Sequence, residues 1–488
     1  MFSGGCRAGQ RRPIRPDADL SPRGIARLVA EFLERLDLRD VILVGGDCRS
    51  SFAVETLCPL CGKANSSTQK YCHGCGASLK VEDRQSAATP VASAALSRSA
   101  RPSDSRYDAI VVGGGVAGAA TACAFARAGV GVAMFERRDL ARDSNRGDLL
   151  HQAAVDHLSA WGALAGLERR GAFYLERTVF TDAAGSFEIG IDQSVHPLLA
   201  LNHAEIEAVL TEAATAAGAE VIRETVRETR FDGQRWIVET NAATASARLL
   251  VGADGAGSRV RTRAGIEAPR KDYAEAVVIL HASRPQWVSS RTYCAVLHPD
   301  GPVLVVATTP EGLCRVVIAI RLAHAARWLN AGAGELSRLL GERVPRLAGM
   351  DVSSSSTYLY RLAQQHASTY VAEKMALVGD AAHVVHPAGG QGMSLAIQDA
   401  AALAEAAGPV LTQDAADDEL QKALLSYEGE RRPLNAKAMK TAHRAARFAR
   451  PGRLNYLLAK TTLRALARLP GGFRVISRRL FGAAETAR

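Results

Sequence analysis

The feature that most constrains this sequence is a set of three glycines between an apolar run and an alanine-rich run. Gly113, Gly115 and Gly118 have the spacing G-x-G-x-x-G, directly after residues 107–112 and before residues 119–128. The apolar run is typical of a buried parallel strand, and the alanine-rich run is typical of a helix. The sequence therefore predicts a strand, a tight turn and a helix, with the glycines in the turn.

Each glycine has its own physical role in such a turn. The first permits a tight turn, the second lets the backbone approach a pyrophosphate, and the third lets the helix and strand pack closely. The N-terminus of the helix adds free N–H groups for the phosphates. Glu136 ends a second predicted strand, at 132–136, and lies 23 residues after Gly113. A carboxylate there can accept hydrogen bonds from ribose hydroxyls, which argues against a 2′-phosphate on the tightly held nucleotide.

Two later segments also end an apolar run with an acid and glycine. Residues 249–253 precede Asp254, and residues 375–378 precede Gly379 and Asp380. The second acid begins a loop that contains two histidines, a proline and three further glycines. Glycine permits backbone conformations and close approaches that other residues do not. We therefore expect this loop to bring its backbone close to a ligand.

These three motifs, in this order, resemble those of the single-component FAD-dependent aromatic hydroxylases, the p-hydroxybenzoate hydroxylase and ubiquinone-pathway hydroxylase superfamily. The resemblance covers roughly residues 107–440. It implies an α/β fold with a Rossmann-type FAD-binding domain and an inserted, mainly β substrate domain. Short β-type runs at about 173–200 and 270–360 suit that insertion, and Ala, Leu and Glu from residue 394 onward predict C-terminal helices.

The resemblance also implies which residues hold the cofactor. Asp380 would hold the ribityl chain, Pro387 would lie beside the reactive face of the flavin, and the glycines after it would bring N–H groups to its pyrimidine edge. The full set of predicted FAD-binding residues is Gly113, Gly115, Gly118, Glu136, Arg137, Arg146, His203, Asp254, Asp380, Pro387, Gly390, Gln391, Gly392 and Met393. This sequence departs from the family at Ser394, where asparagine is usual, and at His203, where arginine or glutamine is common.

The implied reaction is hydroxylation or epoxidation of an aromatic or polyketide-like small molecule. NADPH or NADH would bind transiently and reduce FAD, and dioxygen would react through a flavin C4a-hydroperoxide in a dry pocket. No catalytic base is assigned: Tyr273, Tyr293, His281 and His298 lie in the predicted substrate region. We expect His383 and His386 to shape the flavin loop.

Two related activities occur on the same fold. A flavin-dependent reductase of the geranylgeranyl-reductase type is the alternative, although such enzymes tend to have an acid at the position of Gln391. Flavin-dependent halogenases have a W-x-W motif, which does not occur here.

The region before the flavin domain has a different composition. Cys58, Cys61, Cys72 and Cys75 form two C-x-x-C pairs, ten residues apart, which predict a structural zinc site in a ribbon-like segment at 55–80. Its role would be interaction rather than catalysis.

Two further N-terminal segments are predicted. Residues 1–50 resemble a fragment of an α/β-hydrolase with Asp47 at the nucleophile position, but Arg49 replaces the glycine of the elbow. Residues 81–106, rich in Ala, Ser and Pro, predict a linker.

The net charge of +10 is concentrated at the C-terminal end. From Lys440 to Arg488 there are twelve basic residues and one acid, so the rest of the chain is almost neutral. We therefore expect no nucleic-acid partner, and we expect 441–488 to be a basic helical tail. Scattered cysteines and the lack of a secretory signal favour the cytoplasm, with peripheral membrane contact through the tail as a second expectation.

Overall fold

The computed structural model describes residues 41–43, 54–57, 64–66, 104–138, 149–192, 197–307 and 312–468. The chain divides into two compact units, Met1–Leu96 and Ser97–Arg488. In the first unit, three short strands form an antiparallel sheet, namely β1 (Val41–Leu43), β2 (Val54–Leu57) and β3 (Ala64–Ser66). The four clustered cysteines and most of the hydrolase-like fragment lie outside the described residues.

A mixed sheet forms the base of the second unit. Its order is β11-β5-β4-β14-β13-β12, and β21 pairs with the end of β14. The parallel strands are β11 (Glu220–Ile222), β5 (Val132–Phe135), β4 (Asp104–Val112), β14 (Thr244–Gly252) and β21 (Met375–Leu377). The antiparallel strands are β12 (Glu228–Phe231), β13 (Trp236–Glu239) and β20 (Val371–Ala372). The strands predicted at 107–112, at 132–136, in the run 249–253 and at 375–378 are confirmed as β4, β5, β14 and β21.

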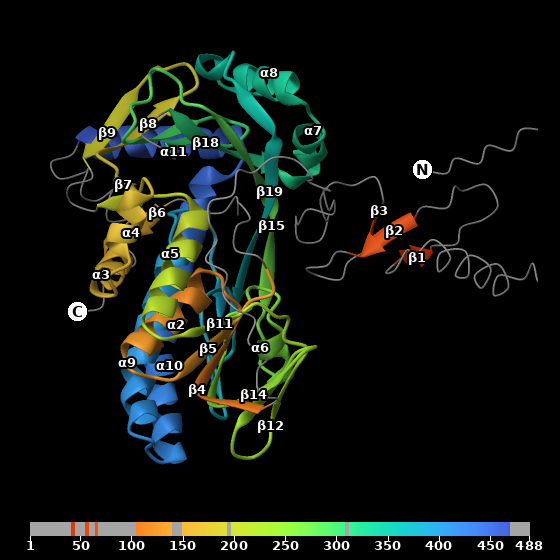
Figure 1. Ribbon diagram of the computed structural model, residues 1–488. Coiled ribbons are helices and arrows are strands. Elements are labelled where there is room, and N and C mark those ends of the chain that lie inside the picture. The colour runs from red at the N-terminus through yellow and green to blue at the C-terminus, as the bar shows by residue number, and fades with distance from the viewer. Residues whose placement is uncertain are drawn as a thin grey trace, which may run out of the picture. The chain divides into compact units, whose positions relative to one another are not determined.

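Helices cover this sheet and bury its apolar strands. Ala109, Ile110 and Val111 of β4 are fully buried, as expected for a parallel strand with both faces covered. The covering helices are α2 (Val116–Arg127), α5 (His203–Ala216), α9 (Gly392–Thr412) and α10 (Asp417–Ala449). Helix α2 is buried almost all round because its alanines let α5 and α9 approach closely. Figure 1 shows these helices side by side beneath the second sheet.

The second sheet forms the other half of the unit. Its order is β22-β19-β15-β18-β17-β16-β8-β9, and its neighbours are antiparallel except for the parallel pair β8 and β16. The strands are β22 (His383–Val384), β19 (Val352–His366), β15 (Arg270–Ser283), β18 (Leu313–Arg321), β17 (Val303–Ala307), β16 (Thr292–Leu297), β8 (Arg177–Asp182) and β9 (Glu188–Asp192). The predicted mainly β insertion is confirmed. In Figure 1, the long strands β15 and β19 of this sheet extend down towards the first sheet.

Two details of this domain differ from the predicted run of short strands. Strands β15 and β19 have 14 and 15 residues. Helices α7 (Ala325–Leu329) and α8 (Ala333–Arg343) lie between β18 and β19 and cover one face of the sheet. Leu336, Leu339 and Leu340 have helical spacing and are buried there, so a helical period interrupts the β-type runs of 270–360.

Smaller elements complete the unit. Strands β6 (Leu149–His151), β10 (Leu198–Ala200) and β7 (Phe173–Tyr174) form a separate three-stranded sheet, accompanied by α3 (Gln152–Ala160) and α4 (Leu164–Arg169). Helix α11 (Arg453–Arg468) packs on the second sheet, where Lys460 Nζ lies 2.6 Å from the buried carboxylate of Asp182. The helices predicted after residue 394 are confirmed as far as residue 468. No described helix has the length and apolar content needed to cross a membrane.

Candidate functional site

The three sequence motifs meet at one edge of the first sheet. Strands β4, β14 and β21 are parallel neighbours, and Val112, Gly252 and Leu377 are consecutive register partners. The motifs begin one or two residues later in each strand, so all three occupy the carboxyl edge of the sheet. Ligands of open α/β sheets bind outside this edge. The register therefore brings together segments that lie more than 260 residues apart in the sequence.

The glycines of the first motif have distinct surroundings. Gly113 has a φ of +107°, and a Cβ there would lie 2.4 Å from the carbonyl oxygen of Ala253. A Cβ on Gly118 would lie 1.8 Å from the carbonyl oxygen of Gly113, so only glycine lets α2 pack this close to the turn. At Gly115 the nearest atom to such a Cβ is 3.5 Å away. Gly115 also precedes α2 without a side-chain cap, so the helix N-terminus stays open to an anion.

Glu136 lies at the end of β5, directly beside this turn. Its Oε2 accepts a hydrogen bond of 2.7 Å from the Gly114 N–H, and its Oε1 accepts one of 2.7 Å from the Arg138 N–H. Burial opposes ionisation of this carboxyl, but hydrogen bonds and the charge of Arg138 lower its pKa below the ordinary value. The carboxylate is therefore ionised and fixed in position. The neighbouring Arg137 is exposed.

The two later acids have carboxylate oxygens available to a ligand. Oδ2 of Asp254 accepts hydrogen bonds from the N–H groups of Arg259 and Val260, at the start of α6 (Arg259–Arg263). Its Oδ1 is buried without a hydrogen-bond partner among the described residues. Asp380 lies in a single 3₁₀ turn, Gly379–Ala381, and its half-buried carboxylate makes no hydrogen bond to another described residue. Each of these carboxylates could accept a hydrogen bond from a hydroxyl group of the ribose or of the ribityl chain.

The loop after Asp380 joins the two sheets. Its residues His383 and Val384 form β22, the edge strand that pairs with β19 of the second sheet. Gly389 and Gly390 then adopt φ values of +102° and +63°, which favour glycine. Gln391 caps α9 without a side-chain bond to the helix, and its Oε1 is buried without a partner among the described residues. Pro387 is exposed, while Gly392 and Met393 are half-buried in the first turn of α9.

A buried carboxylate holds this loop in place. Oδ2 of Asp399 accepts hydrogen bonds from His383 Nε2 at 2.6 Å and from the Gly379 N–H at 3.2 Å. Its Oδ1 accepts bonds from Arg431 Nε at 3.0 Å and Asn435 Nδ2 at 2.9 Å, both on α10. Burial alone would raise the pKa of Asp399, but the charges of His383 and Arg431 and the hydrogen bonds from His383 and Asn435 lower it to about 2.

Sequence reasoning missed Asp399, Arg431 and Asn435. The only signal was a lone acid in an apolar helical run, since residues 395–404 otherwise consist mainly of Ala, Leu and Ile. His383 has the loop-shaping role expected for it.

A second clamp involves the residue at which the family pattern fails. The Oγ of Ser394 accepts a 3.0 Å hydrogen bond from the His151 N–H, and His151 Nε2 lies 2.8 Å from the carbonyl oxygen of Gly389. The serine therefore ties β6 to the start of α9. Because Gly389 lies between Pro387 and Gly390, this contact also fixes the loop expected beside the flavin.

The remaining predicted residues are placed as follows. His203 begins α5 and is buried, with Nε2 3.5 Å from Glu207 Oε1. His281 accepts a hydrogen bond from the buried Arg315, and Tyr293 is half-buried on β16. Arg146, Cys58, Cys61, Cys72 and Cys75 lie outside the described residues. Within the described ranges, no group of His, Cys, Asp or Glu side chains could hold a metal ion.

Together these residues fit FAD. An open helix N-terminus lies beside Gly115, a fixed carboxylate at Glu136, and a buried acceptor without a partner at Asp254. The chemistry of these groups suits a pyrophosphate and ribose hydroxyls. The loop from Gly389 to Gly392 adds a backbone that follows left-handed φ values and ends at a second helix N-terminus.

Comparisons with known proteins identify the family of this chain. A family described as an FAD binding domain matches residues 106–442. Ubiquinone hydroxylase UbiL of Rhodospirillum rubrum is 31% identical over 73% of this chain and 83% of its own length. An uncharacterized aromatic compound monooxygenase, YhjG of Bacillus subtilis, is 30% identical over 60% of each chain.

A solved structure has the same fold. The p-nitrophenol 4-monooxygenase PnpA from Pseudomonas putida aligns with a TM-score of 0.67 at 22% identity, covering 79% of this chain and 100% of that one. The fold and site define a flavoprotein of the Rossmann type. The chain belongs to the FAD-dependent monooxygenase family and is an oxidoreductase.

Gly115→Asp should abolish FAD binding without unfolding the protein. The new carboxylate would occupy the space above the open helix N-terminus and repel the pyrophosphate. Flavin absorbance after gel filtration, together with circular dichroism, measures both properties. Gly429→Asp is the matched control, because Gly429 is exposed on α10 and a Cβ there meets nothing within 4 Å. A yellow Gly115→Asp protein would contradict the assignment.

Asp399→Asn should destabilise the protein and weaken its flavin loop. The change leaves Arg431 buried without its counter-charge, a loss of roughly 3–5 kcal/mol in the free energy of unfolding. In the parent, the Asp399 pKa is lowered from 3.8 to about 2, so its contribution is complete above 3.8 and is lost as pH falls towards 2.

Urea unfolding at several pH values measures both effects. The acid-induced loss of stability should be smaller in the Asn variant than in the parent. Asp418→Asn, an exposed acid on α10, should change stability by less than about 1 kcal/mol. Equal effects of the two variants would contradict the role of Asp399.

Proposed function

We propose that the protein hydroxylates or epoxidises an aromatic or lipophilic small molecule, using NADPH or NADH and dioxygen. One observation carries the substrate class. Leu149, which a Cβ on Gly390 would meet at 3.7 Å, packs with Val306 and Ala307 of β17 and with the half-buried Tyr293. An apolar and aromatic cluster therefore adjoins the flavin loop, and it would favour a substrate with an apolar ring.

The strand register supports a wall on this side of the second sheet. Helices α7 and α8 cover the opposite face, with Val305, Val316 and Ile318 in their core. Val306 and Tyr293, which are register partners on β17 and β16, therefore point away from those helices. Phe173 and Leu198, from the small sheet, pack against the same side. An apolar wall of this kind suits oxygen activation, because water promotes wasteful release of peroxide.

The chain's own residues would divide the work between binding and positioning. Gly115, Glu136 and Asp254 would hold the adenosine diphosphate half of FAD, and Asp380 the ribityl chain. The N–H groups of Gly390 to Gly392 would stabilise negative charge at the pyrimidine edge of the ring. When bound, FAD supplies hydride acceptance from the nicotinamide and activation of dioxygen. Asp399 and Ser394 would keep the loop in the required shape.

Relatives give this proposal its chemical range. The similar proteins include a ubiquinone hydroxylase and a rifampicin monooxygenase, and a structure of PqsL from P. aeruginosa contains 2-aminobenzoylacetate. These are aromatic or ring-containing compounds acted on or bound by those proteins. For this chain we infer the same broad class. The geranylgeranyl-reductase-type alternative remains the competing activity.

A substrate screen decides between these activities. Purified protein with bound FAD should oxidise NADPH slowly alone and severalfold faster with an accepted aromatic compound, and the product should gain one oxygen atom. Oxygen uptake and mass spectrometry measure these changes, and added catalase reveals uncoupled peroxide. A product that gained two hydrogens without oxygen uptake would favour the reductase.

We also propose one structural zinc ion in the 55–80 segment, held by Cys58, Cys61, Cys72 and Cys75. Four thiolates at two C-x-x-C pairs form a closed tetrahedral site, which favours an interaction role over catalysis. Elemental analysis of the full chain, made under reducing conditions with zinc, should find one zinc per chain. Cys58→Ser with Cys61→Ser should remove it, whereas Cys123→Ser, a buried cysteine of α2, should not. Equal zinc content in all three proteins would contradict the site.

We propose the same domain boundaries as the sequence predicts: a hydrolase-like fragment at 1–50, a linker at 81–106, the flavin and substrate domains at 107–440, and a basic tail at 441–488. Lipid contact by the tail stays a prediction. In its described part, Lys460 and Arg464 are bonded to Asp182 and Ser186, so some of the tail's charge has a structural role. We expect a cytoplasmic protein.

A further inference from the structure

A row of basic residues lines the end of α10 next to the second sheet. His443 and Arg447 are spaced i and i+4 on α10 and share one face of the helix, and Arg450 follows directly after the helix ends at Ala449. His443 Nδ1 lies 2.7 Å from the hydroxyl of Tyr273, and Arg450 Nε lies 3.5 Å from Glu275 Oε1. Both partners are on β15, so this face of α10 lies over the start of that strand.

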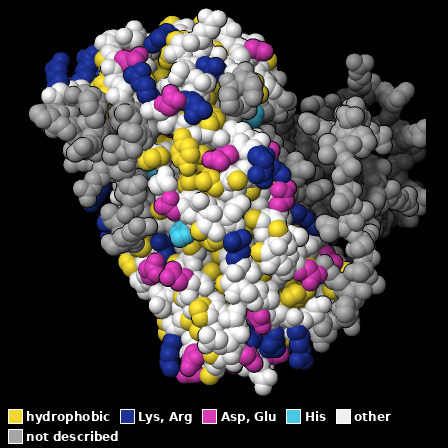
Figure 2. Space-filling view, turned by 60° about the vertical axis from the view of Figure 1, so that its left-hand side comes forward, with side chains coloured by type: hydrophobic (Ala, Val, Ile, Leu, Met, Phe, Trp, Pro, Cys, Tyr) yellow, Lys and Arg dark blue, Asp and Glu magenta, His cyan; other side chains and the backbone are white. Residues whose placement is uncertain are grey.

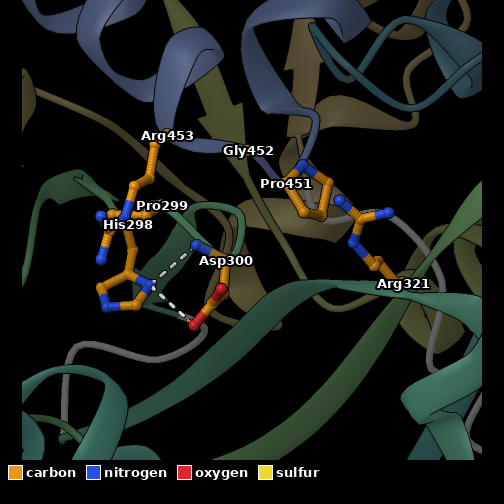
Figure 3. Close-up of a pocket in the computed structure, with 7 residues that line it drawn as sticks. All are labelled: His298, Pro299, Asp300, Arg321, Pro451, Gly452 and Arg453. Atoms are coloured by element: carbon orange, nitrogen blue, oxygen red, sulfur yellow. Dashed lines mark hydrogen bonds and ion pairs between the residues drawn. The ribbon is translucent and has the colours of Figure 1, made fainter.

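The row continues into a cavity at the junction of α10 and α11. Glu275 is the register partner of Arg321 at the end of β18, and Arg321 lines the cavity. The cavity has a volume of about 340 Å³, and its lining comprises His298, Pro299, Asp300, Arg321, Pro451, Gly452 and Arg453. Figure 3 shows Arg321 and Arg453 on opposite sides of Pro451, with His298 bonded to Asp300.

The charge of this surface is strongly positive. Four cations on this surface are exposed, and none of the four forms an ion pair with another described residue: Lys271, Arg321, Arg447 and Arg453. The nearby acids are Asp272, which pairs with Arg270, Glu275, which pairs with Arg450, and Asp300, which lies 3.8 Å from His298. Burial lowers the pKa of His443, and the charges of Lys271, Arg450 and Arg447 lower it further. Figure 2 shows Lys and Arg side chains around the upper end of the molecule, where the second sheet lies.

The same surface leads to the flavin loop. The ring of Tyr273 lies edge-on to the ring of His386, with their centroids 4.8 Å apart. His386 directly precedes Pro387, the residue expected beside the reactive face of the flavin. Nδ1 of His386 accepts a hydrogen bond from the Ala388 N–H, so the imidazole ring helps to hold the backbone of the loop. Tyr273 and His386 are both buried, so this packing contact links the basic row to the flavin loop.

We propose that this row and the cavity form the docking site for the phosphate groups of the nicotinamide cosubstrate, with NADPH preferred over NADH. The inference rests on the proposed function. The pyrophosphate of a dinucleotide is bound well by arginine or lysine donors in an open groove. The 2′-phosphate adds about −1.5 to −2 charge, which suits a cavity bounded by Arg321 and Arg453.

The test measures binding and turnover of the full-length, FAD-loaded protein. In the Arg321→Gln, Arg453→Gln double variant, KM for NADPH should rise about tenfold, because two charge-assisted phosphate contacts are lost. KM for NADH should rise less, and kcat should stay unchanged. Calorimetric titration with NADP⁺ and NAD⁺ should show the same difference without turnover. Arg444→Gln removes an exposed positive charge from another face of α10 and should match the parent.

The proposal would be overturned by a double variant that binds NADP⁺ as tightly as the parent. If that variant also lost retention on vesicles of phosphatidylcholine and phosphatidylglycerol, the arginines would be assigned to lipid phosphates instead. Failure of the proposed function itself would look different, because the parent would then bind NADP⁺ or FAD without producing an oxygenated product.

Discussion

The buried carboxylate of Asp399 is the interaction on which the rest of the site depends. It is fully buried, and it joins the Gly379 N–H and His383 of the flavin loop to Arg431 and Asn435 of α10. An ionised group without water is tolerated only when its oxygens are all paired. The arrangement therefore couples the shape of the loop to the position of α10. Loss of the Asp399 carboxylate would leave the guanidinium of Arg431 buried without its counter-charge.

That coupling reaches further because α10 also carries His443 and Arg447 and ends directly before Arg450. The helix begins beside the first sheet, passes the flavin loop and ends at the cavity below the second sheet. One helix thus contacts both the loop that surrounds the flavin and the proposed docking surface for its reductant. The loop itself connects the two sheets, since it leaves β21 of the first and contributes β22 to the second. The two sheets are therefore joined by this loop of the chain as well as by packing.

The class of oxidoreductase and much of its cofactor geometry follow from local patterns. The strand, glycine turn and helix around Gly113 could be predicted because steric restriction at glycine and apolar periodicity act over a few residues. The same holds for the strands that end at Asp254 and Gly379. Helix α8 also has a local signal, because its buried leucines follow the helical period. The role of Ser394 could not be predicted, because its partner His151 lies 243 residues away in sequence.

By itself, the sequence determined the order of the motifs, the individual strands that carry them and the position of the glycines, since each depends on contacts between near neighbours in the chain. Only the tertiary structure decided which distant groups share a charge or a hydrogen bond. Asp399 with Arg431, and Glu275 with Arg450, meet through strand register and helix packing. Electrostatic partners of this kind leave no periodic signal, because a charge is paired by distance in space and not by spacing along the chain.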